Sequence, residues 1–324
     1  MKNFKWAEPQ TIEQAIALLA KGDGKTVLMA GGTDLLTEIK EGVVGPETVV
    51  DLKAVQGLAF ITKEKDAVRI GAMTTVADLA ADPSIKLDYP LLHQAALSLA
   101  TPQLRHVGTV GGNLCQRPRC WYYRDVQVVC RKKGGSQCYA LRGRNKYHAI
   151  FGGGICSIVH PSDLAPALVA LDAQAVIGSP RGDKTVPLAE FFALPAKNVR
   201  RENVLAADEL LREIRIPPAK KGEKSAYVKL RERGTWDFAL VSSAVKGTVS
   251  GKTVRDVRVI LGGAAPVPWR LGKTEASVNG KPLSEGLIRE AVRIDLQEAR
   301  PLEDNGYKPQ LVETAVSRAL LSLV

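Results

Sequence analysis

All five cysteines of the 324-residue chain lie between positions 115 and 156. An odd number of cysteines in a large chain argues against a disulfide framework. Four thiolates can hold either Zn²⁺ or an iron–sulfur cluster. Structural zinc sites usually place their cysteines in close pairs. The long, irregular intervals in this segment therefore favour a cluster, while zinc and free cysteines stay open as alternatives. The four widely spaced candidates are Cys120, Cys130, Cys138 and Cys156.

The cysteine segment is also strongly basic. From Gln116 to His148 it holds nine lysines and arginines and a single acid, Asp125, which gives +8 of the chain's net charge of +11. Three interpretations follow from this charge. It stabilises the reduced form of an anionic cluster, it keeps a solvated loop soluble, or it forms a docking face for an acidic electron carrier.

Two glycine-rich turns, at 30–34 and 109–113, each place small residues and backbone N–H groups where a strand is expected to end. Glycine lets the backbone approach a phosphate closely, and the amides of such a turn bind anions. Thr33, Thr109 and Asn113 add side-chain donors. The two turns together can clamp the phosphates of a dinucleotide, and the alternative is two tight turns without a ligand. Neither turn matches the Rossmann fingerprint.

The hydrophobic pattern predicts a mixture of helices and antiparallel strands. A Pro/Gly-rich charged stretch at 216–222 predicts a linker. Helices are expected at 11–21, from 35 onward, and at 90–100, 163–171, 273–278, 287–293 and 309–322. Strands are expected at 25–29, 48–52, 59–62, 67–72, 173–177, 226–231, 240–249 and 254–262.

Composition narrows the classes of function. The chain is 45% hydrophobic and 24% charged, as is typical of a folded globular protein. Aromatic residues make up only 5%, which argues against a platform for nucleic acid. No stretch reaches the ~20 apolar residues of a membrane span. The first residues lack the apolar region of a signal peptide, which predicts a cytoplasmic protein, or a periplasmic one if it is exported with a signal-bearing partner.

Several motifs occur in an order that resembles the FAD-binding subunits of the xanthine dehydrogenase / carbon monoxide dehydrogenase family. They are AGGTDL at 30–35, TVGGNL at 109–114, HPSDLAPAL at 160–168, YVKLR at 227–231 and VRVILGGAAP at 257–266. The resemblance implies an α+β chain with a vanillyl-alcohol-oxidase-type FAD-binding fold. Its two subdomains would span 1–57 and 58–217, and a smaller α+β C-terminal domain would span 218–324.

The resemblance also implies how FAD is held. The first turn and the 109–113 segment would hold the pyrophosphate, Asp163 would bind hydroxyl groups of the cofactor, and Lys229 would lie near the isoalloxazine. A cation there stabilises anionic reduced flavin. Without the surrounding motifs, the favoured interpretation of Asp163 is a helix N-cap, and that of Lys229 is a solvated strand residue. The full predicted set is Leu28, Met29, Ala30, Gly31, Gly32, Thr33, Asp34, Leu35, Thr101, Thr109, Gly111, Gly112, Asn113, Asp163 and Lys229.

The cysteine insert, at about 115–156, resembles that of two subgroups of the family, the periplasmic aldehyde oxidoreductases and the 4-hydroxybenzoyl-CoA reductases. In both, the flavin subunit holds a 4Fe–4S cluster. By this resemblance the metal ligands would be Cys120, Cys130, Cys138 and Cys156, while Cys115 would be a free thiol near the flavin.

The implied function is electron transfer, with no catalytic residue on this chain. Electrons would pass between the 2Fe–2S clusters of a small partner subunit, FAD, the 4Fe–4S cluster and an external electron carrier. Substrate chemistry, on an aldehyde or an aromatic acyl-CoA, would occur on a large molybdenum-cofactor subunit. The alternative is a self-contained FAD-dependent oxidase or reductase. The four histidines of the chain form no obvious catalytic constellation for it.

Overall fold

The computed structural model describes residues 2–324, and its strands form three sheets. The first sheet is parallel, with the order β1-β3-β2. Helix α1 begins after Thr11, whose side chain accepts a hydrogen bond from the Gln14 amide, as its capping sequence predicts. The elements of this part are β1 (Lys5–Ala7), α1 (Ile12–Lys21), β2 (Thr26–Met29), α2 (Leu35–Lys40) and β3 (Thr48–Asp51).

The second sheet is antiparallel, with the order β4-β5-β8-β6-β7. Its core includes Ile70, Leu92 and Leu168. The strands are β4 (Ile61–Lys63), β5 (Val68–Gly71), β6 (Gln174–Gly178), β7 (Lys184–Pro187) and β8 (Leu210–Ile216). The helices are α3 (Val76–Ala81), α4 (Pro83–Asp88), α5 (Pro90–Ser98), α6 (Pro102–Val107), α7 (Val110–Cys115), α9 (Leu164–Ala170) and α10 (Leu188–Phe191).

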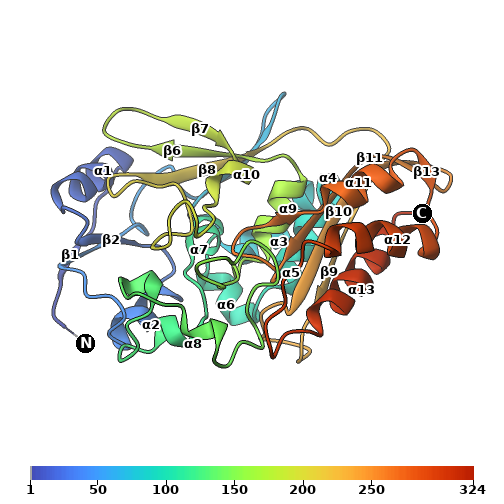
Figure 1. The fold of residues 1–324 in the computed structure, drawn as a ribbon. Helices are drawn as coiled ribbons and strands as arrows, with labels where there is room; N and C mark the ends of the chain where they lie inside the picture. The colour runs from blue at the N-terminus through green and yellow to red at the C-terminus, as the bar shows by residue number, and fades with distance from the viewer. Residues whose placement is uncertain (1) are drawn as a thin grey trace.

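The third sheet has the order β12-β11-β10-β9, and helices pack against both of its faces. Helix α13 contacts β9 and β10, while α5 and α9 of the preceding part contact β9 and β11 (Figure 1). The strands are β9 (Glu223–Leu230), β10 (Val241–Ser250), β11 (Thr253–Gly262), β12 (Trp269–Arg270) and β13 (Lys281–Pro282). The helices are α11 (Gly272–Val278), α12 (Glu285–Leu296) and α13 (Lys308–Leu321).

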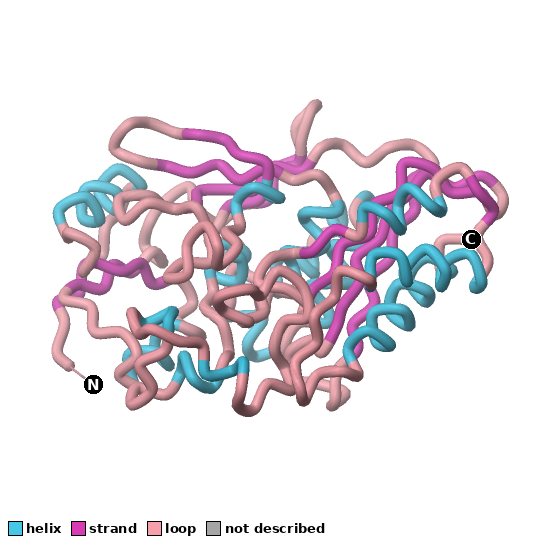
Figure 2. Tube along the Cα trace, viewed as in Figure 1, coloured by secondary structure: helices cyan, strands magenta, loops and turns pink. Residues whose placement is uncertain are grey.

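The segment between α7 and α9 is almost entirely loop (Figure 2). It contains only α8 (Trp121–Arg124) and the 3₁₀ turns η1 (Arg131–Lys133) and η2 (Tyr139–Leu141). This segment carries four of the five cysteines, and α8 lies beside α2 (Figure 1). Glu38 of α2 accepts a hydrogen bond from Tyr123 of α8. The insert therefore lies against the N-terminal part of the chain.

The α+β class predicted from the sequence is confirmed, and so are most of the predicted elements. The prediction of a glycine turn at 109–113 is wrong, because residues 110–115 form helix α7. The two glycines lie in the first turn of this helix. Thr109 caps this helix by accepting a hydrogen bond from the Gly112 amide. Among residues 2–324, no helix combines the length and the apolar character needed to cross a membrane.

Candidate functional site

A cleft of about 1020 Å³ is lined by both glycine segments. Ligand sites are typically ~300–1,000 Å³, so this cleft is large enough for an extended dinucleotide. Its walls include twelve of the fifteen predicted FAD-binding residues: Leu28, Ala30, Gly31, Gly32, Thr33, Asp34, Leu35, Thr109, Gly111, Gly112, Asn113 and Asp163.

The first glycine segment follows β2 and packs directly against the chain before α7. A Cβ added to Gly31 would lie 2.0 Å from the carbonyl oxygen of Val107, so only glycine fits at this position. Gly32 has a φ of 75°, a left-handed conformation that favours glycine. Gly31 therefore permits the close approach of the two segments that form the cleft wall, and Gly32 permits the turn that follows it.

The second segment presents the N-terminal turn of α7 to the cleft. A Cβ on Gly111 would lie 2.8 Å from the Cβ of Ala72, so this turn also packs tightly. The Asn113 side-chain oxygen accepts a hydrogen bond of 2.5 Å from the Ser162 hydroxyl. This contact turns the amide hydrogens of Asn113 away from Ser162, so they are available as donors at the cleft.

Asp163 lies at the N-terminus of α9, buried in the cleft wall. It accepts hydrogen bonds from Tyr227 (3.0 Å) and Lys229 (2.8 Å) of β9. Burial raises the pKa of its carboxyl group, and the Lys229 cation opposes that shift. Asp163 forms no side-chain capping bond, so its partners are the two β9 residues rather than the helix backbone.

Three predicted residues do not line the cleft. Lys229 lies behind Asp163, Met29 packs in a small core with Ile39, and Thr101 caps α6 through its bond with the Leu104 amide. Their contacts with a cofactor stay predictions.

The cleft also has walls that the sequence analysis missed. Part of the β9–β10 loop, including Trp236 and Phe238, lines the cleft together with Arg117 and Arg119. The Arg119 guanidinium lies 5.0 Å from the Phe238 ring centroid, which joins the insert to this loop. No local motif marks these residues, because the contact joins positions far apart in the chain.

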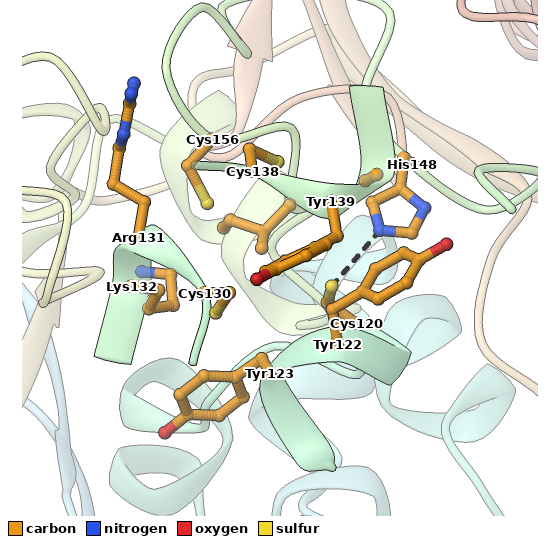
Figure 3. Close-up of a pocket in the computed structure, with 12 residues that line it drawn as sticks. Cys120, Tyr122, Tyr123, Cys130, Arg131, Lys132, Cys138, Tyr139, His148 and Cys156 are labelled. Atoms are coloured by element: carbon orange, nitrogen blue, oxygen red, sulfur yellow. Dashed lines mark hydrogen bonds between the residues drawn. The ribbon is translucent and has the colours of Figure 1, made fainter. Parts of the chain in front are cut away.

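Four cysteines line a second, narrow cavity of about 10 Å³ (Figure 3). They are the predicted ligands Cys120, Cys130, Cys138 and Cys156. Tyr122, Tyr123, Tyr139 and His148 complete much of the wall. Cys115 lies apart from this group and lines the large cleft, called the flavin cleft below after the cofactor that the sequence predicts. Burial raises the pKa of its thiol to about 12. Cys115 is therefore a protonated, unreactive thiol at neutral pH.

The four thiols differ in their readiness to lose a proton. A hydrogen bond from Cys156 lowers the pKa of Cys138 to about 6, whereas burial raises the pKa of Cys120 to about 11. Metal ligation requires the thiolate form of each cysteine. Within residues 2–324, no three Cys, His, Asp or Glu side chains are grouped closely enough to hold a single metal ion.

Ion pairs hold the basic insert against the cleft. Asp34 at the start of α2 pairs with Arg124 (2.7 Å) and Arg119 (3.0 Å), and Glu202 pairs with Arg117 (2.6 Å) and with the buried Lys132. Much of the insert's charge is therefore neutralised inside the molecule. Asp34, predicted as part of the FAD cradle, joins that cradle to the insert.

Comparison with known proteins gives the family. Residues 2–219 match the model described as the FAD binding domain in molybdopterin dehydrogenase. Residues 225–323 match the model described as the CO dehydrogenase flavoprotein C-terminal domain. The chain belongs to this family of FAD-binding subunits. The chain is therefore an FAD-binding subunit of an oxidoreductase.

Curated relatives and a solved structure agree with this assignment. The chain is 35% identical to the aldehyde oxidoreductase FAD-binding subunit of Escherichia coli (strain K12), over 99% of this chain and 98% of the relative. It is 30% identical to the carbon monoxide dehydrogenase medium chain of Hydrogenophaga pseudoflava, over 98% and 96%.

The solved structure of carbon monoxide dehydrogenase from Hydrogenophaga pseudoflava matches with a TM-score of 0.80 and 28% identity. The match covers 99% of this chain and 97% of that one. The predicted fold, an FAD-binding part followed by a C-terminal α+β domain, is confirmed.

Proposed function

We propose that this FAD-binding subunit passes electrons between a molybdenum-containing partner and an external carrier through FAD and a 4Fe–4S cluster. The observation that carries the proposal is the position of the four-cysteine cavity on a loop that is ion-paired to the flavin cleft. Electron transfer between two redox centres requires that the centres lie close together, and this ion pair holds the cysteine loop against the flavin cleft.

The cleft suits FAD in size and in chemistry. Both glycine segments line it, and Asn113 supplies a side-chain donor. The amides in the first turn of α7 already donate to Thr74, Ala72 and Thr109, so backbone donors for a phosphate would come from the first glycine segment. When bound, FAD exchanges electrons in pairs or singly. The chain's own residues orient it: Asp163 accepts hydrogen bonds from cofactor hydroxyls, and Lys229 and Tyr227 hold that carboxylate in place.

The donor set of the second cavity suits a cluster. Its four thiols come from separated points of one loop, and three tyrosines cover them. Cys120, Cys130, Cys138 and Cys156 would be the ligands, and the bound cluster would supply one-electron transfer. The buried pair of Lys132 and Glu202 holds the loop that carries Cys130. Two basic residues of the insert, Arg142 and Arg144, are exposed and form no ion pair among residues 2–324.

The proposed partners are a large molybdenum-cofactor subunit, a small 2Fe–2S subunit and the external carrier. Two relatives are named as a FAD-binding subunit and a medium chain, which supports a multi-subunit assembly. The name aldehyde oxidoreductase favours an aldehyde over an aromatic acyl-CoA as the substrate of that assembly. The proposed compartment is the cytoplasm, or the periplasm if the complex is exported with a signal-bearing partner.

The variant Cys130→Ser tests the role of the cluster in the assembled complex. Turnover with a protein carrier should fall strongly, while turnover with a small dye that accepts electrons at the flavin should persist. Ser136→Ala is the matched control, because its side chain lies exposed in the same loop. Normal turnover of an iron-depleted Cys130→Ser complex with every acceptor would refute the role.

A self-contained oxidase needs an acid–base group beside the flavin. No histidine lines the flavin cleft in the described part of the chain, and Asp163 is engaged by Lys229 and Tyr227. We therefore favour the electron-transfer role over this alternative.

A further inference from the structure

His148 has a contact with the cysteine cavity that the proposed function does not yet use. Its Nε2 atom lies 3.2 Å from Sγ of Cys120 (Figure 3). Its Nδ1 atom is buried and has no hydrogen-bond partner among the described residues. The cysteine sulfur is therefore the polar neighbour of this ring.

The position of His148 is set by the C-terminal domain. Its backbone amide donates to the Asn145 carbonyl (3.0 Å), and its own carbonyl accepts from the Asn305 side chain (3.0 Å). Asn145 and Asn305 are fully buried. The Asn305 side chain also donates to the Asn145 carbonyl. These bonds hold the backbone of His148 on both sides of the side chain whose ring contacts Cys120.

The direction of the hydrogen bond follows from the chemistry of ligation. A cysteine that binds iron has lost its proton, so its sulfur can only accept. A neutral imidazole carries one N–H, and Nδ1 forms no hydrogen bond that meets the distance and angle limits among residues 2–324. The proton therefore lies on Nε2 and points at the sulfur.

We infer that His148 donates an N–H···S hydrogen bond to Cys120 and thereby raises the reduction potential of the proposed cluster. This inference rests on the 4Fe–4S cluster of the proposed function. A donor at a ligand sulfur withdraws charge from the cluster and so stabilises its more negative, reduced form. His148 is thus a tuning residue, which touches a ligand and not the iron.

The test is an EPR-monitored redox titration of the intact protein, with iron content measured first. His148→Phe removes the donor, and His148→Gln keeps an N–H at similar reach. Tyr122→Phe is the matched control, since Tyr122 lines the same cavity and no hydrogen bond joins its hydroxyl to a sulfur within residues 2–324. The potential should fall in the Phe variant, stay near wild type in the Gln variant and be unchanged in the control.

Equal potentials in wild type and both His148 variants would overturn the inference, and so would equal falls in the two variants. In either case the proposal of a 4Fe–4S cluster would be unaffected. Absence of iron from the wild type would instead overturn the cluster proposal as well. If the Phe variant loses its iron, ¹⁵N-histidine labelling of the wild type decides. A weak nitrogen hyperfine coupling that His148→Gln removes supports the hydrogen bond, whereas no coupling, or the strong coupling of a direct iron ligand, contradicts it.

Discussion

The flavin cleft and the cysteine cavity are held together in different ways. The glycine segments of the cleft follow or begin regular elements, β2 and α7, and pack backbone against backbone at Gly31 and Gly111. The cysteine cavity is made of side chains on loops. Those loops are fixed by charges and hydrogen bonds to distant parts of the chain, such as Glu38, Glu202 and Asn305.

This difference predicts different sensitivities. In the cleft, an added Cβ disrupts binding because the backbone has no room to move. In the insert, removal of one buried partner leaves an uncompensated charge or polar group, which is costly. The following changes separate the two regions, from the largest expected effect to the smallest.

Glu202→Gln should have the largest effect. It removes the charge that faces Lys132, and the side chains of that pair are 2% and 3% exposed. Loss of one partner of a buried pair costs ~3–5 kcal/mol. Urea unfolding measures the loss, and iron should be lost with it. The control Glu232→Gln removes a solvent-exposed pair with Lys146 and should leave stability unchanged. Equal effects of the two variants would contradict our description of the insert.

Gly31→Ala should break the cleft while sparing the insert. Its new Cβ would collide with the Val107 carbonyl oxygen, so the first segment must shift. FAD affinity should fall at least on the order of tenfold, or ~1.4 kcal/mol. Gly45→Ala is the matched control, because Gly45 lines the same cleft and its added Cβ would meet only the Lys2 side chain, at 3.9 Å. Flavin titration measures affinity, and iron loss in Gly31→Ala would argue against independent regions.

Tyr123→Phe should loosen the insert through a buried carboxylate. The Tyr123 hydroxyl donates to Glu38 at 2.6 Å, and its loss leaves a buried acceptor, at a cost of ~1–3 kcal/mol. Burial already raises the pKa of Glu38 above its usual value of 4.5, and the tyrosine hydrogen bond opposes this shift.

The penalty of Tyr123→Phe should depend on pH. A raised carboxyl pKa means that the folded state holds its proton longer, so stability falls as the pH rises through that window. Without the Tyr123 hydrogen bond the pKa of Glu38 in the folded state rises further, so the pH range over which stability falls extends upward. Unfolding curves should therefore show a larger penalty at neutral pH than below 4.5, and a pH-independent penalty would refute the role of Glu38.

Ser162→Ala should have the smallest effect. Its hydroxyl orients Asn113 and accepts from the Ala165 amide, so the variant loses contacts worth ~0.5–1.5 kcal/mol each. FAD affinity should decrease a few-fold. Ser179→Ala, an exposed turn residue, is the control. An unchanged affinity would mean that Asn113 does not depend on Ser162 for its orientation.

Local signals explain what could be predicted from the sequence. The Thr11 cap and the strands β10 and β11 were predicted from short stretches of neighbouring residues, and the structure agrees with these predictions. The central strand β8 was missed. Its pairing with β5 and β6 joins distant parts of the chain, and so it leaves no local mark.

In the candidate site, too, the sequence predicted residues with a local pattern but not the contacts between distant parts of the chain. The four cysteines were found by type and interval, and they line one cavity. Their supports were not found, because Asp34, Glu202 and Asn305 lie far from the insert in the chain. Helix α7 was taken for a turn because its two glycines masked the Thr109 cap. Long-range charge pairing of this kind has no periodicity to detect.

Cofactor analysis of the anaerobically purified protein tests the central claim most directly. The account predicts FAD together with iron and acid-labile sulfide, about four of each inorganic component per chain, and an EPR signal after reduction that Cys130→Ser abolishes while the FAD remains. Bound FAD without iron, or with zinc in the cysteine cavity, would contradict it.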